Sequence, residues 1–412
     1  MPAAAPLSES HLAELRLFIE DVCCDFTLCD EVIAKERPLG SVRIDREFPL
    51  GPECFADIRI AAVGEPVRFV EVKVGCSSAA IVKRLRQKYG TVGAGARGGR
   101  LVVILDLEKR LDKEDLARSV REAVSPDLAV ELWGEPDLRA RVRERLGVEL
   151  DAIGDLELLD VRDRFETVMG LHAFTDGPPS AELATYRNDS LRAELLWHLG
   201  PARIRALRKG RDLSARDILP PRTYRSVATL ICDLSSFSSF VRDTREPEVV
   251  RECLTAFYTK SRYQIVNGGG MLYQFIGDAV LAFFGVPDGV EQAASQCLDV
   301  SRALLAIGDS VAHHWQRRID RVQQHHGVHI GVTIGDVELM SLRPFSRTRI
   351  GAVSDAINVA ARLLAAAGPG EIVASNSFVH RLTDEERHGF EPLEPLEARN
   401  VGRIMAWRFR RA

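Results

Sequence analysis

The sequence predicts a protein of the α+β class, in which a mixed α/β domain and a helical linker precede a larger α+β domain. Short β-branched runs alternate with segments of helical periodicity along the chain of 412 residues. The hydrophobic fraction of 46% is enough to build more than one core in a chain of this length. Pro220 and Pro221 interrupt the alternation and mark the expected break before the last domain.

The first predicted domain covers residues 1–150. Its sharpest strand is GRLVVILDLE, and its closing helix carries Leu138, Val142 and Leu146 at helical spacing. The elements expected in order are a helix near 8–26, strands near 42–48, 55–61 and 67–74, a helix, the strand at 99–108, and a strand and helix within 131–153.

Residues 151–224 are predicted to form a helical linker, and residues 225–412 the last domain. Strand and helix patterns alternate in that domain, which indicates a sheet covered by helices with a βαββαβ-type core. The expected order is a strand and turn at 225–237, a helix at 246–266, a hairpin at 268–285, a helix at 291–311, a strand at 328–339, a helix at 354–367, and strands at 371–375 and 404–409.

The composition of the chain excludes several classes of protein. Lys and Arg number 55 against 59 Asp and Glu, so the formal net charge of -4 gives no global positive field for binding nucleic acid. The N-terminus lacks the pattern of a signal peptide, and no apolar run reaches the length of a membrane span. The eight cysteines form no C-x-x-C pair, so we expect buried free thiols in a cytoplasmic protein that makes no membrane contact.

Two aspartates stand out by their context. Asp233 follows the apolar run VATLIC, and Asp278 lies in the predicted turn of the hairpin FIGDAVLAFFG. Such positions expose both carboxylates at one edge of a sheet. Paired carboxylates are hard oxygen ligands suited to Mg²⁺ or Mn²⁺, which hold nucleotide phosphates and activate an attacking oxygen. The pair therefore predicts a site for divalent cations and a phosphorylated substrate.

Three motifs in order resemble the class III nucleotide cyclase catalytic domain: ATLICDLSSFSSF, GGGMLYQFIGDAVLAFFG and AINVAARL. The resemblance covers nearly all of 225–412. In that family the strand-end aspartate, the backbone carbonyl after it and the hairpin aspartate bind two divalent metal ions, Mg²⁺ or Mn²⁺. The resemblance assigns these roles to Asp233, Leu234 and Asp278.

The family also carries an N-x-x-x-R pair on a helix. Its Asn orients the ribose and its Arg stabilises charge on the transferring phosphoryl group, and these match Asn358 and Arg362. The i, i+4 spacing places both side chains on one helix face. A Lys near the last strand of the family contacts the phosphates; here we expect Arg399, or else Arg403, in that role.

The resemblance implies an intramolecular reaction. The 3′-hydroxyl of a nucleoside triphosphate attacks its own α-phosphate, which expels pyrophosphate and gives a 3′,5′-cyclic monophosphate, so the enzyme would be a lyase. The protein would contribute mainly positioning and charge. Family active sites form between two subunits, with the metal ligands from one and the Asn/Arg pair from the other. Because this chain carries both halves, the resemblance implies a homodimer with two sites at the interface.

Two base-selecting positions depart from the residues usual in the family. Adenylate cyclases typically carry Lys and guanylate cyclases Glu where this chain has Gln274, and the second position, commonly Asp, Thr or Cys, is Gly351. Gln both donates and accepts hydrogen bonds, so it could read uracil or cytosine, while Gly351 leaves room or exposes backbone. Tyr273 and Phe275 flank Gln274 and could stack on a base or pack in the hairpin. We therefore favour a pyrimidine cyclase that converts UTP or CTP to cUMP or cCMP.

Two other interpretations of this domain stay open, an adenylate cyclase that makes cAMP and a sensor without activity. The pyrimidine interpretation is similar to the cyclases of the bacterial Pycsar anti-phage systems. That similarity implies an antiviral second messenger and a separate effector protein that answers the cyclic nucleotide.

A second acidic motif lies in the first domain. Asp57 is near the end of one predicted strand, and Glu71 and Lys73 share one side of the next. The pattern resembles the PD-(D/E)xK nuclease-like, or restriction-endonuclease-like, core, in which two acids bind Mg²⁺ and the Lys positions or activates water. Further residues that would suit that fold are Glu14 or Glu20 and, on the later helix, Gln87 and Tyr89.

A solvated alternating strand would give the same acidic pattern, and a fold alone does not fix a function. The basic stretch KRLRQKYG offers a modest surface for an anionic ligand, so nucleic acid stays open as a partner of this domain. We favour a regulatory or sensor role over cleavage. The second alternative for the whole chain is a nuclease with a degenerate cyclase domain.

Overall fold

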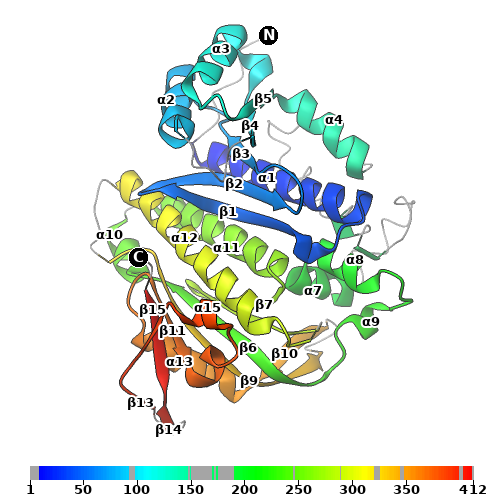
Figure 1. Cartoon of the computed structure of the whole chain (residues 1–412), viewed down its shortest axis with the longest axis vertical. Coiled ribbons are helices and arrows are strands. Elements are labelled where there is room, and N and C mark those ends of the chain that lie inside the picture. The colour runs from blue at the N-terminus through cyan, green and yellow to red at the C-terminus, as the bar shows by residue number, and fades with distance from the viewer. Residues whose placement is uncertain are drawn as a thin grey trace. The chain divides into compact units, whose positions relative to one another are not determined.

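The computed structural model describes residues 9–91, 98–146, 149, 169–170, 173–174, 190–244, 246–287, 289–319, 325–343, 348–398 and 402–410. The chain divides into two compact units, Met1–Met169 and Gly170–Ala412. Each unit has its own sheet and its own core (Figure 1). The predicted division into three parts stays a prediction, because most of the stretch from 151 to 189 lies outside the described residues.

The first unit has a five-stranded sheet of order β1-β2-β3-β4-β5. Strands β1 to β3 pair antiparallel, whereas β3, β4 and β5 are parallel. Parallel neighbours need crossover connections, and the helices α2 (Ser78–Tyr89) and α3 (Lys113–Ala123) lie in them. The strands are β1 Val42–Gly51, β2 Cys54–Ala62, β3 Arg68–Val72, β4 Arg100–Ile104 and β5 Ala129–Trp133.

Side chains alternate between the two faces of this sheet. On one face, Leu101 and Val103 of β4 join a core with α2 and α3. Arg68 points to the other face, whereas Glu71, three residues later on β3, points to the α2 face. The elements on the Arg68 face are α1 Glu9–Leu28, its continuation η1 Cys29–Ala34, and α4 Glu135–Leu146.

The second unit is built around an eight-stranded sheet of order β12-β15-β11-β9-β6-β8-β7, with β10 paired to β9. Each of these pairs is antiparallel except β11 with β9. The succession β6-α11-β7-β8-α12-β9 follows the βαββαβ order. The strands are β6 Arg222–Leu234, β7 Gly270–Ile276, β8 Ala279–Phe284, β9 Val328–Leu342, β10 Arg349–Val353, β11 Glu371–Ser375, β12 Phe390–Pro392 and β15 Ala406–Arg410, with β13 Leu396–Ala398 and β14 Gly402–Ile404 paired separately.

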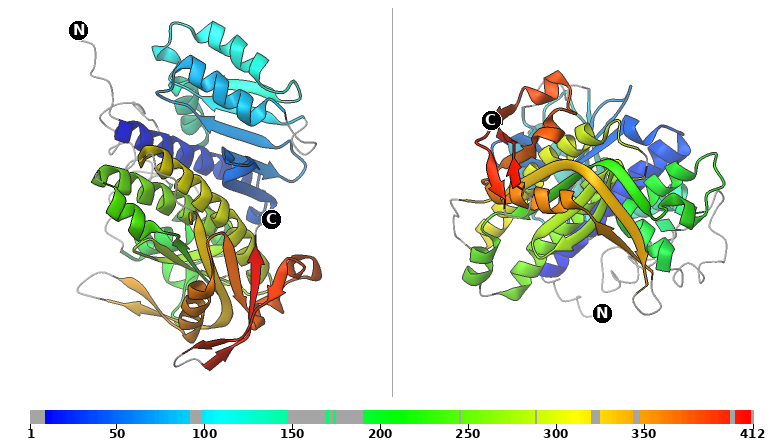
Figure 2. Two further views of the ribbon diagram at one scale, coloured as in Figure 1. Left: turned by 90° about the vertical axis from the view of Figure 1, so that its left-hand side faces the viewer. Right: turned by 90° about the horizontal axis from the view of Figure 1, so that it is seen from below.

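Helices cover both faces of this sheet (Figure 2). Leu230 and Cys232 of β6 pack on the face covered by α11 and α12. Val227 and Ile231 pack on the face covered by α7, α8 and α13. Asp233 continues this second series, so its side chain belongs to the α13 face. The helices are α7 Ser190–Leu199, α8 Pro201–Arg208, α9 Ala215–Ile218, α10 Phe237–Asp243, α11 Pro247–Asn267, α12 Ala293–Ile319, α13 Asp355–Ala366, α14 Asn376–Val379 and α15 Asp384–Arg387.

The mixed α/β architecture predicted from the sequence is confirmed, with local differences. The strand expected at 99–108 ends early, because Leu107–Lys109 forms a 3-10 helix. The helix expected at 291–311 continues to Ile319, because Trp315 is buried in the core. The sequence pattern does not predict β10, which pairs with the end of the long strand β9.

All eight cysteines are free thiols, and six of them are buried, as expected. Burial raises the pKa of the Cys23 thiol to about 12, which keeps it protonated and unreactive at neutral pH. Among the residues that the structure describes, we find no helix with both the length and the apolar character that crossing a bilayer requires.

Candidate active site

The two aspartates singled out by the sequence lie at one end of the second sheet. Asp233 is opposite Ala279 of β8 and His329 of β9 in the strand register. Asp278 directly precedes Ala279, in the turn that it forms with Gly277 between β7 and β8. Gly277 has a φ of 62°, which glycine adopts readily because it lacks a Cβ. The register therefore brings the two carboxylates together.

The electrostatics of the pair follow from this proximity. Burial raises the pKa of Asp233 to about 6, and the charge and a hydrogen bond of Asp278 act in the same direction. A hydrogen bond from the Leu234 backbone partly opposes the shift. Among the described residues no Lys or Arg forms an ion pair with either aspartate. Two like charges therefore meet without a cation, which is the donor set that a divalent metal ion fits.

Leu234 follows Asp233 and contributes no side-chain ligand, because its side chain is buried in the main core. In the part of the chain that the structure describes, no group of three or more His, Cys, Asp or Glu side chains could hold a metal ion. Metal ligation here would therefore fall to the carboxylates of Asp233 and Asp278 together with the backbone carbonyl of Leu234.

His329 and Tyr258, which no sequence motif singles out, contact the aspartate pair or the turn that carries it. His329 Nε2 lies 3.6 Å from Asp233 Oδ2, and His329 Nδ1 lies 3.0 Å from Ser235 Oγ. Burial lowers the pKa of His329, which favours the neutral ring at neutral pH. Tyr258 donates a hydrogen bond to the Gly277 carbonyl and so holds the turn that carries the second aspartate. Only the register of β6 against β9 reveals that His329 belongs to this site.

Asn358 and Arg362 lie on the exposed side of α13. The helix begins after Ser354, whose hydroxyl accepts a hydrogen bond of 3.0 Å from the backbone N–H of Ala356. Neither Asn358 nor Arg362 forms a hydrogen bond or an ion pair with another described residue. Within one chain, the structure thus records no contact between this helix pair and the aspartate pair.

The two positions that were predicted to select the base lie next to residues that contact each other. Gln274 is exposed on β7, and Gly351 is buried on β10. The backbone N–H of Ala352 donates a hydrogen bond of 3.0 Å to the Tyr273 hydroxyl, which joins the residues next to these two positions. This contact links β7 to β10 although the two strands do not pair in the sheet.

The space beside Gly351 is filled by the neighbouring strand. A Cβ added to Gly351 would lie 2.7 Å from Leu342 Cδ1 and 3.3 Å from Met340 Cγ. The room that the missing side chain leaves is therefore taken by Leu342, contrary to the expectation of an open space. Leu342 remains 46% exposed, so it presents apolar surface at this position.

The other residues predicted for this site are the phosphate-binding candidates and the aromatic neighbours of Gln274. Arg399 lies outside the described residues, and Arg403 is exposed on β14. Tyr273 and Phe275 pack against aromatic rings of their own unit, with Phe275 stacked on Tyr258 at a centroid distance of 4.1 Å. These rings are thus engaged in packing around the hairpin.

The acidic motif of the first unit is also assembled. Lys73 Nζ lies 2.7 Å from Asp57 Oδ2 and 2.6 Å from Glu71 Oε2. Lys88 of α2 adds contacts of 3.2 Å to Asp57 Oδ1 and 2.7 Å to Glu71 Oε2. Tyr89 donates a hydrogen bond of 2.7 Å to Glu71 Oε1. Two acids and two lysines therefore form one neutral cluster.

The lysines decide the ionisation of this cluster. Burial acts to raise the pKa of Asp57, but Lys73 and Lys88 outweigh it and hold this pKa well below its usual range. The sequence pattern does not single out Lys88, since the charged stretch around it also fits a solvated helix face. Of the other residues considered, Glu20 pairs instead with Arg46 at 2.5 Å.

The sheet with its aspartate pair now defines a class of protein. Residues 219–409 match the family model described as adenylate and guanylate cyclase catalytic domain. The match supports a class III nucleotide cyclase catalytic domain in this part of the chain, which contains the aspartate pair.

Similar proteins include two from Mycobacterium tuberculosis. The uncharacterized protein Rv1319c is 26% identical over 240 residues, which cover 58% of this chain and 40% of that protein. The uncharacterized protein Rv2212 is 28% identical over 208 residues, which cover 49% of this chain and 48% of that protein. The chain thus spans less than half the length of these curated relatives.

Similar solved structures include the guanylyl cyclase Cya2, with 22% identity and a TM-score of 0.40 over 46% of this chain and 93% of that one. The adenylyl cyclase CyaB from P. aeruginosa has 17% identity and a TM-score of 0.38 over 46% of this chain and 96% of that one.

Proposed function

We propose that the chain converts a nucleoside triphosphate into its 3′,5′-cyclic monophosphate and pyrophosphate. The observation that carries this proposal is the proximity of Asp233 and Asp278, which have no Lys or Arg partner among the described residues. A purely structural acidic pair carries its own counter-ions, as Asp57 and Glu71 do. An uncompensated pair at a sheet edge suits cations that arrive with a triphosphate.

Asp233, Asp278 and the Leu234 carbonyl would hold two Mg²⁺ or Mn²⁺ ions. When bound, such ions neutralise phosphate charge and make a hydroxyl easier to deprotonate. Asn358 would orient the ribose, and Arg362 would donate hydrogen bonds to the α-phosphoryl oxygens as their charge grows. The bond between the 3′-oxygen and the α-phosphorus forms, the bond from the α-phosphorus to the bridging oxygen breaks, and the hydroxyl proton and pyrophosphate leave.

We propose further that the active form is a homodimer with two shared sites. The exposed and unpaired state of Asn358 and Arg362 within their own chain supports this arrangement. Mixing Asp278→Ala with Arg362→Ala should restore about a quarter of wild-type turnover, because about half the dimers are mixed and each holds one intact site.

Mixing Asp278→Ala with Asp233→Ala is the matched control, since both changes damage the same half of the site. This mixture should stay inactive. If the first mixture stays inactive as well, although its chains exchange, each site is built within a single chain.

For the substrate, we propose UTP or CTP. Gln274 offers both a donor and an acceptor to a pyrimidine edge, whereas the Lys and Glu typical of purine cyclases are absent. Leu342 fills the space beside Gly351 and offers no hydrogen-bonding group, so Gln274 would make the polar contact to the base. The alternative is an adenylate cyclase that makes cAMP.

The deciding experiment supplies ATP, GTP, CTP and UTP separately to the purified full chain with Mn²⁺ and separates the cyclic products by chromatography. Mainly cUMP or cCMP is the expected result. Mainly cAMP would establish the adenylate cyclase alternative, and no cyclic product from any of the four would remove the cyclase proposal.

A double substitution tests how the base is read. Gln274→Lys with Gly351→Asp should shift the preference toward ATP, since Lys and Asp can bond to the adenine edge once Leu342 moves aside. Gln87→Lys makes the same Gln-to-Lys replacement at an exposed position of the first unit and should leave the preference unaltered. An unchanged profile in the double variant would mean that other residues read the base.

For the first unit, we propose a restriction-endonuclease-like domain with a regulatory or sensor role. The support is Lys88 Nζ, which contacts both Asp57 and Glu71 and so supplies positive charge that a metal ion would otherwise bring. The full chain with Mg²⁺ should leave DNA and RNA intact. Cleavage that disappears in Asp57→Ala but persists in Asp278→Ala would establish the nuclease alternative.

We propose that the cyclic nucleotide is an antiviral signal made in the cytoplasm and answered by a separate effector protein. The support is the resemblance to Pycsar cyclases together with the base-selecting residues Gln274 and Gly351. Phage infection of cells that express the chain should raise cUMP or cCMP, and Asp278→Ala should abolish the rise. Constant levels during infection would contradict a defence role.

A further inference from the structure

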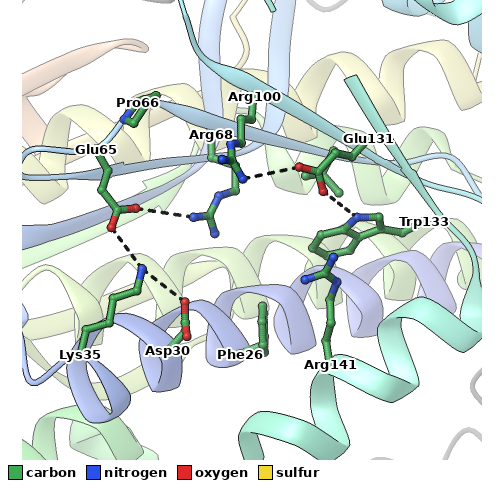
Figure 3. Close-up of a pocket in the computed structure, with 11 residues that line it drawn as sticks. Phe26, Asp30, Lys35, Glu65, Pro66, Arg68, Arg100, Glu131, Trp133 and Arg141 are labelled. Atoms are coloured by element: carbon green, nitrogen blue, oxygen red, sulfur yellow. Dashed lines mark hydrogen bonds and ion pairs between the residues drawn. The ribbon is translucent and has the colours of Figure 1, made fainter. Parts of the chain in front are cut away.

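The first unit contains a cavity of about 510 Å³ that the cyclase proposal does not use (Figure 3). It lies between the sheet and the helices α1 and α4, and the beginnings of β3 and β4 form part of its wall. Arg68 lines the cavity, whereas Glu71 on the same strand faces α2. The cavity is therefore on the opposite face from the lysine cluster, and its size suits a ligand as large as a mononucleotide.

Two arginines are adjacent in this cavity. Arg68 and Arg100 are directly paired in the register of the parallel strands β3 and β4, so both side chains leave the same face of the sheet. Like charges on directly opposite strand positions repel each other. An anion that accepts hydrogen bonds from both guanidinium groups would neutralise this repulsion. Its binding would therefore be favourable.

The nearby carboxylates do not satisfy these arginines. Arg100 Nη1 lies 3.6 Å from Glu131 Oε1, and Arg68 Nη2 lies 3.8 Å from both Glu65 Oε2 and Glu31 Oε1. These separations exceed hydrogen-bond length. Within the described residues, neither guanidinium donates a hydrogen bond to a carboxylate, so its N–H groups remain available to a ligand.

One end of the cavity is aromatic. Trp133 is fixed by a hydrogen bond of 3.1 Å from its Nε1 to Glu131 Oε2, and the guanidinium carbon of Arg141 lies 4.0 Å from the ring centroid. Figure 3 shows Arg68 reaching into the middle of the cavity, with Trp133 and Arg141 at one end and Phe26 rising from α1. The cavity thus joins a cationic centre to flat apolar walls.

The balance of charge also favours an anion. Lys35 is already paired with Glu31 at 2.8 Å, with Glu65 at 3.1 Å and with Asp30 at 3.5 Å. The lining holds four cations and three acids, and three of the four cations are arginines. The charged lining consists of the cations Lys35, Arg68, Arg100 and Arg141 and the acids Asp30, Glu65 and Glu131.

We propose that this cavity binds a nucleoside monophosphate or a ligand of the same chemistry, a phosphoryl group carried on a sugar with a planar ring. The phosphoryl group bridges Arg68 and Arg100, and the ring packs toward Trp133 and Phe26. The site is independent of the aspartate pair in the second unit and of the lysine cluster on the other face of its own sheet.

The test is isothermal titration calorimetry of the full chain in EDTA with four probes: uridine monophosphate, adenosine monophosphate, ribose 5-phosphate and inorganic phosphate. A nucleoside monophosphate should bind, and Arg100→Gln should weaken that binding at least about tenfold, because one charge-assisted pair is lost. Arg100 is 58% exposed at its side chain, so its replacement spares the fold. Arg118→Gln, with 70% exposure on α3, is the matched control and should bind like the wild type.

Three results would overturn the inference: binding that is equal in wild type, Arg68→Gln and Arg100→Gln, phosphate that binds as tightly as the nucleotide, or no binding by any probe. Binding at the cyclase site is recognised separately, because it would persist in Arg100→Gln and fall in Asp278→Ala. Failure of this proposal and failure of the cyclase proposal are therefore distinguishable.

Discussion

The two units of this protein each bring a pair of carboxylates together, and the two pairs behave in opposite ways. Asp57 and Glu71 share two lysines, and the pKa of Asp57 falls well below its usual range. Asp233 and Asp278 have no such partners among the described residues, and the pKa of Asp233 rises to about 6. The two pairs thus differ in their counter-charge: the first has two lysines, and the second has no Lys or Arg partner among the described residues.

The largest expected effect in this comparison is on turnover. Asp278→Ala removes half of the uncompensated pair and should lower metal-dependent turnover about 1,000-fold, because a bound metal ion contributes several kcal/mol to charge stabilisation. Initial rates with Mn²⁺ measure the loss, and an unchanged melting temperature shows that the domain is folded. Asp384→Ala, at a fully exposed position, is the control, and wild-type turnover by Asp278→Ala would remove this residue from the site.

The next effect is on the stability of the first unit. Lys88→Met leaves the fully buried Glu71 with one lysine fewer and should cost about 3 kcal/mol in the free energy of unfolding. Denaturant unfolding of the full chain, followed at probes in the first unit, measures this cost. Lys83→Met changes the same charge on the exposed side of α2 and should be nearly neutral. Equal stability of the two variants would mean that Lys73 alone neutralises the acids.

A smaller effect is the pH dependence of cation binding. Because the pKa of Asp233 is about 6 and not near its ordinary 3.8, protons compete with cations in the mildly acidic range. The affinity for Mn²⁺ should be about tenfold weaker at pH 5 than at pH 7, which electron paramagnetic resonance of free Mn²⁺ can measure. A flat profile over this range would contradict the raised pKa.

The pKa shifts of Asp233 and Asp57 change the stability of the fold with pH in opposite directions. The metal-free folded protein retains a proton on Asp233 that the unfolded chain releases, so its unfolding free energy falls as the pH rises from about 4 through about 6. Asp57, with its lowered pKa, contributes stability above the usual carboxyl range and loses it only as the pH falls further.

The smallest expected effect is an increase in the free energy of unfolding. Asp278→Asn removes one of two adjacent like charges, so the metal-free second unit should become slightly more stable at pH 7, by a few tenths of a kcal/mol up to about 1 kcal/mol. Thermal unfolding in EDTA measures this gain, with Asp384→Asn as the control. A clear loss of stability would show that Asp278 makes a favourable contact that outweighs the repulsion.

The sequence was sufficient to predict the aspartate pair because its motifs are local. Asp233 ends a buried strand and Asp278 sits in a tight turn, so sequence order alone indicates where each carboxylate emerges. Lys88 could not be predicted in the same way, since its role depends on how α2 docks onto β3.

The surroundings of Gly351 are a second feature that could not be predicted from the sequence. The filling of its space by Leu342 depends on the pairing of β10 with β9, and the sequence pattern predicts no strand at β10. Likewise, the adjacency of Arg68 and Arg100 exists only through strand register, because 32 positions separate them in the chain. Sites built from a local motif can thus be predicted from the sequence, whereas contacts between strands that are distant in the chain cannot.

The outward-facing residues Asn358 and Arg362 have a consequence for how such a protein would be controlled. If each site is completed by a second chain, a dilute protein gains about fourfold in output when its amount doubles, because dimers form in proportion to the square of the monomer concentration. Expression level alone would then set a threshold for the proposed activity.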